Sequence, residues 1–406
     1  MSSGIDRSMF KRPTGSSGID LKSTLEQKET NVRIVSYNVL SSKLCSSKYH
    51  VECTPENLDP TNRLKRLQEK LILHIEQKAI ICLQEVSDEW SPHLENFFKT
   101  KNYVVYSSQY SPELGILIAY PQDKYLPVGP NVEDALYNIT VGEYFEKFTA
   151  RKTDIEAMIM ILAIVISVTI NQSFVSFWIT ILEIVLISSL IYRACHVKFD
   201  EWKKAISKQN EVLIVNLIDK ETNFPFHVGT YHMPCAYKNP DIMKIHALTV
   251  SRIMDDICKS TPYILAGDFN IVPMTRAKLN IDRQGRSLSQ TEFNTSQLKT
   301  QIYQWLTNGG FYTEMINPSP NFEIARHFRI PPMRSVYGEF RGEPEYTCKS
   351  KTKDMEEVFR GTLDYIFVSP SWKIHKVLDI PKDVEKSYPS EKEPSDHFMI
   401  GTELSA

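Results

Sequence analysis

The sequence has no excess of charge of either sign. Its 406 residues carry 47 basic and 49 acidic side chains, for a formal net charge of −2. A protein that coats nucleic acid needs a broad positive field, so this class is excluded, although nucleic acid held at a local site is not. The hydrophobic fraction of 42% excludes collagen-like, coiled-coil and fully disordered chains.

Paired cysteines are also lacking, because none of the seven cysteines stands in a C-x-x-C pair. Their odd number and scattered positions exclude a disulfide scaffold and a structural zinc site, and favour a reducing compartment. The cysteines are Cys45, Cys53, Cys82, Cys195, Cys235, Cys258 and Cys348.

Three phosphate- or nucleophile-binding loops are missing: G-x-x-x-x-G-K-[ST], G-x-S-x-G and G-x-G-x-x-G. Their absence excludes the P-loop, α/β-hydrolase and dinucleotide-binding classes of enzyme.

Residues 1–30 are polar, repeat the string SSGID and lack the apolar run of a signal peptide. We expect residues 1–30 to form a disordered tail ahead of a folded region, 31–405.

Short apolar runs separated by polar segments predict a mixture of strands and helices. Residues 58–76 predict a helix, with Asp59 as its cap and Pro60 in its first turn, and residues 240–259 predict an amphipathic helix. The order lacks strict βαβ alternation, which favours packed layers with mixed sheets over a Rossmann fold. The predicted strands are 32–36, 79–83, 114–120, 212–218, 226–232, 263–268 and 363–369.

Residues 155–192 form the largest shift in composition along the chain, with Glu183 as the only charged residue after Glu156 and before Arg193. A polar turn at 171–173 divides this run into two arms, which predicts a hydrophobic helical hairpin that contacts a membrane. The alternative is a helical pair buried in an enlarged core. Residues 278–298 are polar and predict a surface insertion, and residues 382–395 predict a long charged loop.

Polar residues stand at or next to the ends of the predicted strands, where a rigid scaffold can direct them into one cleft. A single polar residue at the end of a strand is common and does not by itself indicate a site. The set, however, supplies carboxylates, amides and histidines together. Mg²⁺ prefers oxygen ligands, and an aspartate can orient an imidazole, so the set suits phosphodiester cleavage. These residues are Asn38, Glu85, His232, Asp268, Asn270, Asp364, Asp396 and His397.

Six short strings carry a family resemblance. In order and approximate spacing, the chain resembles the endonuclease/exonuclease/phosphatase superfamily, which is DNase I-like. The resemblance implies a four-layered α/β (α+β) sandwich with two central mixed sheets, interrupted here by the hairpin at 155–192. The strings are SYNVL (36–40), LQEV (83–86), GTYHMP (229–234), GDFN (267–270), GTLDYIF (361–367) and PSDHF (394–398).

The resemblance also implies roles for the matching residues. Glu85 would be the principal Mg²⁺ ligand, with Asn38 beside it and Asp396 as a direct or indirect metal group; Mn²⁺ could substitute. Asp268 and Asn270 would position the nucleophilic water and the phosphate. The remaining three residues would act on the phosphate, and Asp364 would be the acid partner of His397. These three are His232, Asp364 and His397.

A narrower match to the deadenylase branch, which includes nocturnin, rests on SYNVLSS (36–42), EPEYT (343–347) and FRGTLDYIF (359–367). That resemblance implies that Phe359 stacks on an adenine base; alternatively, Phe359 is a packing aromatic. The segment MPCAYKNP after His232 departs from the branch, as does the hydrophobic run. No leucine-rich repeat is present, so we expect no docking module of the large deadenylase complexes.

The leading hypothesis is therefore a membrane-associated, Mg²⁺-dependent 3′-exoribonuclease inside the cell, with its catalytic domain facing the cytosol and RNA as its substrate. A membrane-lipid phosphodiesterase is the alternative, since sphingomyelinases and inositol-phosphate phosphatases resemble it in fold. A degenerate scaffold is the third possibility, and it conflicts with the complete set of catalytic residue types.

Overall fold

The computed structural model describes residues 29–128, 135–147, 203–273, 301–311, 329–353, 358–381 and 388–406. The tail up to residue 28, the hydrophobic segment 155–192 and the polar segment 278–298 lie outside these residues. Within the described ranges, no helix is both long and apolar enough to cross a bilayer. At the predicted tail boundary, Thr30 is already buried and its backbone pairs with that of Ala406.

Six strands form the first sheet, and all neighbours in it are antiparallel except β1 and β2. Its predicted strands are confirmed within one or two residues at each end. The spatial order is β16 (Lys373–Val377), β17 (Ile400–Ser405), β1 (Asn31–Asn38), β2 (Ile80–Gln84), β4 (Gly115–Pro121) and β3 (Tyr103–Gln109).

Seven strands form the second sheet, in which only β8 and β9 are parallel. Strand β6 (Leu136–Thr140) pairs with β7 beside the main path. That path runs β12 (Arg334–Ser335), β15 (Asp364–Val368), β9 (Tyr263–Asp268), β8 (Pro225–His232), β7 (Glu211–Asp219) and β5 (Tyr125–Pro127).

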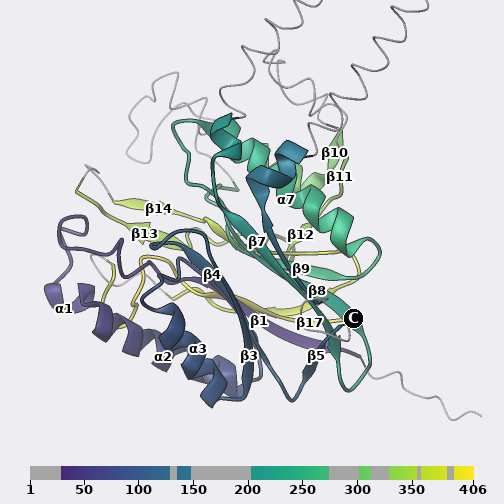
Figure 1. Ribbon diagram of the computed structural model, residues 1–406, viewed down its shortest axis with the longest axis horizontal. Coiled ribbons are helices and arrows are strands. Elements are labelled where there is room, and N and C mark those ends of the chain that lie inside the picture. Colours follow the sequence, from purple (N-terminus) through teal and green to yellow (C-terminus); the bar gives the residue numbers. More distant parts are fainter. Residues whose placement is uncertain are drawn as a thin grey trace, which may run out of the picture.

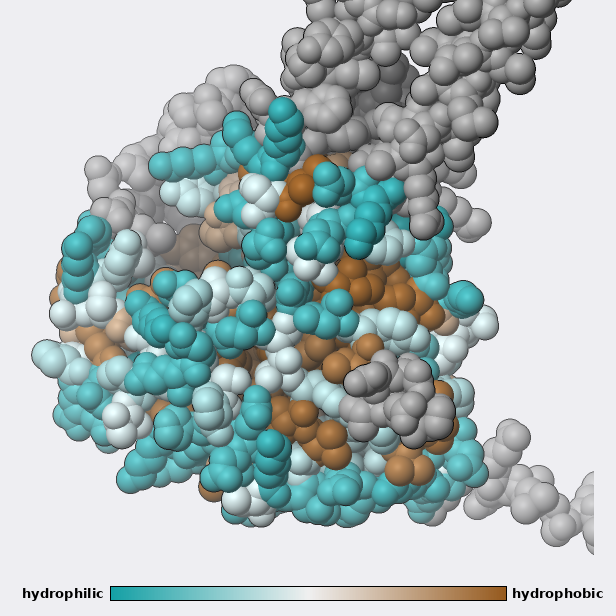
Figure 2. Space-filling model, viewed as in Figure 1, coloured by the Kyte–Doolittle hydropathy of each residue, from teal (hydrophilic) through white to brown (hydrophobic). Residues whose placement is uncertain are grey.

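The two sheets pack face to face, and helices cover their outer faces (Figure 1). One apolar cluster joins residues of both sheets, such as Ile34 and Ile264, so the main core lies between them. The first sheet packs outward on α2 (Pro60–Glu76) and α3 (Ser91–Thr100), and the second packs on α7 (Pro240–Cys258). Figure 2 shows a largely hydrophilic exterior with hydrophobic residues in separate patches. The four-layered sandwich predicted from the sequence is confirmed.

Smaller elements add to the described fold, in which residues 141–147 and 301–308 are also helical. Helices α1 (Pro55–Leu58) and α9 (Val336–Phe340) are short, and two hairpin-like sheets lie outside the main pair. One of these joins β13 (Cys348–Ser350) to β14 (Phe359–Gly361), and the other joins β10 (Gly310–Phe311) to β11 (Arg329–Ile330).

Helix α2 begins where the sequence predicts. The Asp59 side chain accepts a hydrogen bond from the Asn62 backbone at 2.8 Å, and Pro60 occupies the first turn, where its missing N–H leaves no donor unpaired. The buried stripe includes Leu67 and Leu71, as expected, and also Arg63, which the apolar pattern does not reveal.

Helix α7 differs from the amphipathic helix expected over 240–259. Every residue from Ile242 to Ser251 is buried, including polar ones. The cause lies in a second set of contacts, because Phe145 and Ala205 pack on Ile242 and Ile245, away from the sheet-facing cluster. The helix is thus covered by the sheet on one side and by the flanks of residues 148–202 on another.

The predicted charged loop 382–395 is mostly buried where it is described, at 388–395, with Glu391 and Lys392 exposed. Glu393 is 4% exposed; it accepts a hydrogen bond from the Tyr37 hydroxyl and pairs with Lys70 at 2.6 Å. A carboxylate with two such partners can be buried at moderate cost, which composition alone does not indicate. The loop therefore packs against β1 and α2 as it approaches His397.

Candidate active site

The two parallel strand pairs bring the predicted residues to one edge of the sandwich. Asn38 ends β1 and Glu85 follows β2, its parallel neighbour; His232 and Asp268 end β8 and β9 and lie opposite each other in register. Asp364 begins β15 and lies opposite Asp268. Gly267 permits this close approach, because a Cβ there would lie 1.9 Å from the Tyr231 oxygen.

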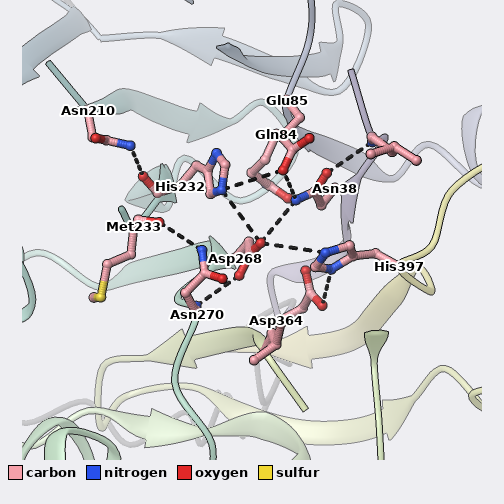
Figure 3. A network of polar contacts seen from close by, with 12 residues as sticks. Asn38, Gln84, Glu85, Asn210, His232, Met233, Asp268, Asn270, Asp364 and His397 are labelled. Atoms are coloured by element: carbon pink, nitrogen blue, oxygen red, sulfur yellow. Dashed lines mark hydrogen bonds and ion pairs between the residues drawn. The ribbon is translucent and has the colours of Figure 1, made fainter. Parts of the chain in front are cut away.

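Asn38 links the two sheets within the site (Figure 3). Its Nδ2 donates to Glu85 Oε1 at 2.9 Å and to Asp268 Oδ2 at 3.0 Å. Its Oδ1 accepts from the Leu40 backbone at 3.0 Å, which fixes the orientation of the amide. As placed, Asn38 orients the carboxylates, and its predicted contact with a metal through oxygen stays a prediction.

Glu85 has a left-handed backbone, with φ of 59°. Such a conformation costs about 1–2 kcal/mol for a non-glycine residue and directs the side chain away from the regular strand. Its Oε2 accepts from the Ser41 backbone at 3.3 Å, while Oε1 lies 3.7 Å from His232 Nε2. The carboxylate therefore points into the space that the other site residues border.

Asp268 is the centre of the site. Its Oδ2 lies 3.6 Å from His232 Nε2 and 3.8 Å from His397 Nε2, and its Oδ1 accepts from the Asn270 backbone at 2.9 Å. Burial raises the pKa of Asp268 to about 6; His397 and His232 oppose the rise, and Asp364 adds to it. The Asn270 amide is held separately, by donation to the Met233 carbonyl at 2.8 Å.

Asp364 and His397 form the contact predicted for them, with His397 Nδ1 2.9 Å from Asp364 Oδ2. Burial alone would lower the pKa of His397, but the charge of Asp364 and this bond raise the pKa well above its ordinary value. Thr347 donates to the same Asp364 oxygen at 2.6 Å and accepts from the Asp364 backbone at 3.0 Å. His397 therefore favours the protonated form.

The donor set fits a hard divalent cation. Glu85, Asp268 and Asp364 supply carboxylates, and the ion-pair partners of the first two are histidines. Two triads, Glu85–His232–Asp268 and Asp268–Asp364–His397, each hold their ligand atoms within 4.8 Å of one another. Adjacent buried carboxylates repel unless a cation compensates them, which Mg²⁺ with its preference for oxygen would do.

Asp396 and Phe359 lie beside this network. Asp396 is buried, its Oδ1 has no hydrogen-bond partner, and it groups with Cys348 and His397 within 4.8 Å. It thus borders His397 on the Cys348 side, and its role as a metal group stays a prediction. Phe359 is half-buried at the start of β14, in the hairpin that pairs with His397 through Cys348.

Sequence reasoning missed several residues that support the site. Gln84 on the first sheet donates to the Thr230 hydroxyl on the second at 2.9 Å, directly beneath Glu85 and His232. Tyr110 and Asn210 contact His232, and no local pattern marks either of them. Three of the supporting residues had a signal, because Gln84, Thr230 and Thr347 lie in the strings LQEV, GTYHMP and EPEYT.

A model of the Endonuclease/Exonuclease/phosphatase family matches residues 35–397 of this chain. Carbon catabolite repressor protein 4 homolog 4 of Arabidopsis thaliana is 31% identical over 159 residues. That match covers 37% of this chain and only 29% of the plant protein.

Solved structures show the same fold at low sequence identity. ANGEL2, described as a 2′,3′-cyclic phosphatase in complex with adenosine-2′,3′-vanadate, aligns with a TM-score of 0.56 at 16% identity, over 93% of this chain and 96% of that one. The human Nocturnin catalytic domain with bound sulfate aligns with a TM-score of 0.51 at 16% identity, over 92% and 93%.

Proposed function

This chain belongs to the endonuclease/exonuclease/phosphatase family of hydrolytic phosphoesterases, and we propose that it is a Mg²⁺-dependent phosphodiesterase that degrades RNA from the 3′ end. The observation that carries the proposal is the single network of Asn38, Glu85, Asp268 and two histidines, drawn from both sheets (Figure 3). The plant relative and Nocturnin support the deadenylase type.

Each side chain has a part in phosphodiester cleavage. Glu85 would hold the metal, with Asn38 orienting the carboxylate; the metal would neutralise charge that develops on the phosphate. Asp268, fixed by Asn38 and the Asn270 backbone, would orient the attacking water. His397, kept protonated by Asp364, would donate to a phosphate oxygen and stabilise the transition state.

The register of the β13–β14 hairpin supports a role for Phe359 with a nucleobase. Cys348 lies opposite Gly361, so the two residues share one face of the hairpin, and on that face Cys348 Sγ lies within 4.8 Å of ligand atoms of Asp396 and His397. Phe359 is two residues from Gly361 and therefore points to that face; its ring is the nearest group to a Cβ built there, at 3.0 Å. Base–aromatic stacking is worth about 1–3 kcal/mol per base.

A membrane-lipid phosphodiesterase is the second candidate, and the apolar run 155–192 favours it. Under either function we propose that this run attaches the enzyme to an intracellular membrane. Site residues precede it (Asn38, Glu85) and follow it, so the ends of the run must lie in one compartment. Basic residues flank it on both sides, which by the positive-inside rule favours the cytosol.

A substrate panel tests the proposal. With Mg²⁺ present, purified protein should shorten poly(A) and mixed-sequence RNA from the 3′ end faster than it hydrolyses single-stranded DNA, a nucleoside 2′,3′-cyclic phosphate or sphingomyelin. Faster turnover of sphingomyelin would overturn the RNA assignment in favour of the lipid one. Faster turnover of the cyclic phosphate would instead indicate an activity of the ANGEL2 type.

Glu85→Gln tests the metal site, because it keeps the shape and removes the charge. Turnover should fall by several orders of magnitude, and calorimetry should show weakened Mg²⁺ binding to a folded protein. Glu89→Gln, a nearby exposed glutamate bound to Ser42 at 2.8 Å, is the matched control. Retention of more than about a tenth of the turnover, equivalent to ~1.4 kcal/mol, would contradict the role.

A further inference from the structure

Two basic side chains lie directly opposite each other on the β13–β14 hairpin. Lys349 is the cross-strand partner of Arg360, and like charges in such a pair destabilise a sheet. Lys349 Nζ lies 5.5 Å from the ring centre of Tyr388, and Arg360 Cζ lies 4.3 Å from that of Tyr346. Glu345 lies 3.9 Å from Arg360 Nη1, but its side chain is 73% exposed, and ion pairs of that kind are weak. The two tyrosine rings thus hold like charges together, where a bound anion would replace repulsion with attraction.

A third basic side chain, Lys353, is exposed just beyond the end of β13. Its Nζ lies 5.2 Å from the ring centre of Tyr49, and its backbone donates to the Tyr49 carbonyl at 2.8 Å. Lys351 pairs with Glu52 of the same loop at 2.8 Å, so its charge is already compensated. We use the name basic strip for Lys349, Lys353 and Arg360.

The basic strip begins beside the active site. The Lys349 backbone donates to the Asp396 carbonyl at 2.8 Å, one residue before His397, and Arg360 directly follows Phe359. Four residues of extended chain span at most about 14 Å, so the backbone of Lys353 lies no farther than that from Lys349. A single-stranded polymer with its 3′ end at His397 would therefore have its upstream phosphates within reach of the strip.

Two kinds of polyanion could bind such a strip, single-stranded RNA and the surface of an anionic membrane. The hydrophobic run 155–192 offers a membrane only near α7, because Phe145 and Ala205, which flank it, pack on that helix. The strip instead lies next to the loop that precedes α1, and Figure 1 shows β13 and β14 well apart from α7. Its position beside His397 and Phe359 therefore favours RNA.

We propose that the basic strip binds the phosphates of single-stranded RNA upstream of the 3′ nucleotide that occupies the active site. The link to catalysis rests on the proposed function, in which that nucleotide is cleaved beside His397. Lysine and arginine donate charge-assisted hydrogen bonds to phosphate oxygens and read no base sequence, so the strip would bind RNA of any sequence. The chain needs such a local site because its net charge of −2 provides no broad positive field.

The salt dependence of RNA binding tests the proposal. Full-length protein is titrated in EDTA, which prevents metal-dependent cleavage, against a fluorescein-labelled oligoadenylate decamer at increasing salt. A variant with glutamine at all three strip positions should bind more weakly. Its slope of log affinity against log salt should become shallower by about 0.7 for each lost phosphate contact, or about 2 in total.

The matched control also replaces two lysines and one arginine by glutamine. These residues lie beside the start of β1, whose other end bears Asn38, and their loss should leave the slope unchanged. An unchanged slope in the strip variant, or an equal change in the control, would overturn the proposal. The control residues are Lys373, Lys376 and Arg33.

Three further measurements keep the test sharp. Lys353→Gln alone, at an exposed position that should not affect folding, should make the slope shallower by about 0.7. Turnover by the strip variant should show a higher KM for the decamer than for a dinucleotide, relative to wild type, with kcat unchanged. Vesicles of phosphatidylcholine and phosphatidylserine should bind the strip variant and wild type equally; loss of vesicle binding with intact RNA binding would overturn the proposal in favour of a lipid surface.

The binding measurement needs no turnover, so this proposal and the proposed function can fail separately. RNA shortened from its 3′ end by a protein whose strip variant keeps the wild-type salt slope would remove only the strip. A shallower slope in the strip variant of a protein that does not cleave RNA would remove only the proposed function.

Discussion

Arg63 is a fully buried cation that joins the two loops bearing the site residues. Its Nε donates to the Pro394 carbonyl at 2.7 Å, and its Nη2 donates to the carbonyls of Val39, at 2.8 Å, and Leu40. The Pro394 carbonyl lies in the loop before His397, and the carbonyls of Val39 and Leu40 lie in the loop after Asn38. The guanidinium also lies 4.9 Å from the Trp90 ring centre, where a planar cation packs well.

Arg63→Lys should therefore lower both stability and activity, although it keeps the charge. A lysine has one nitrogen and cannot reach carbonyls on two loops, so several charge-assisted hydrogen bonds are lost at about 1.5–3 kcal/mol each. Denaturant unfolding should show a loss of several kcal/mol. Arg33→Lys, at an exposed pair with Glu403, should change stability by less than about 1 kcal/mol. Equal effects of the two substitutions would contradict the account.

Asp364→Asn should shift the alkaline limb of the pH profile of kcat/KM to lower pH. His397 must carry a proton to donate to the phosphate, so activity falls as pH rises through its pKa. Asp364 raises that pKa against the effect of burial, and without its charge the pKa drops. Asp256→Asn, at a surface pair with Arg252, should leave the profile unchanged.

The same pair should be non-additive. When two residues act as a unit, removal of either one abolishes most of the catalytic effect of both. The double variant with alanine at Asp364 and His397 should therefore be barely slower than His397→Ala alone. Fully additive losses, or an unshifted alkaline limb in Asp364→Asn, would show that the 2.9 Å contact has no part in catalysis.

At the scale of elements, the sequence predicted the seven strands whose apolar runs are buried, but it did not predict partly exposed strands such as β3 and β16. All of β9, from Tyr263 to Asp268, is buried, and the polar residue at its end marks where the strand leaves the core. Pairing direction carries no such signal, since nothing in the three sequences shows that β1 pairs parallel with β2 but antiparallel with β17. Long-range partners such as Arg63 and Tyr110 stayed hidden because their contacts depend on that pairing.

Phe359→Ala on the β13–β14 hairpin tests base recognition. If the ring stacks on an adenine, kcat/KM on adenine-rich RNA should fall by an amount equivalent to about 1–3 kcal/mol. Hydrolysis of a small phosphodiester without a base should be nearly unchanged, because the hairpin still places Cys348 against His397. Phe340→Ala, an exposed phenylalanine on α9, controls for loss of an aromatic ring. Equal losses on both substrates would mean that Phe359 supports only the fold.

At the scale of the whole molecule, the active site depends on two halves of one chain that the segment 148–202 separates. The first sheet supplies Asn38 and Glu85 from before the segment, and the second supplies His232 and Asp268 from after it. The flanks of the segment meet, because a Cβ on Gly142 would lie 2.4 Å from the Ile206 oxygen. Phe145 and Ala205 pack together on α7. The residues on the two sides of the segment are therefore in direct contact, and the fold is continuous without the segment.

This closure predicts that the hydrophobic run can be removed without loss of the site. Deletion of 155–192, with a flexible linker joining 154 to 193, should leave kcat/KM on a soluble substrate within a few-fold, since loop length adds little closure free energy. Full-length protein should stay in the membrane pellet after alkaline-carbonate extraction of cells, and the deletion variant should not. Complete extraction of the full-length protein would contradict membrane attachment. If the deletion variant failed to fold, the run would instead be a core element, because an attachment placed outside a closed fold contributes nothing to its stability.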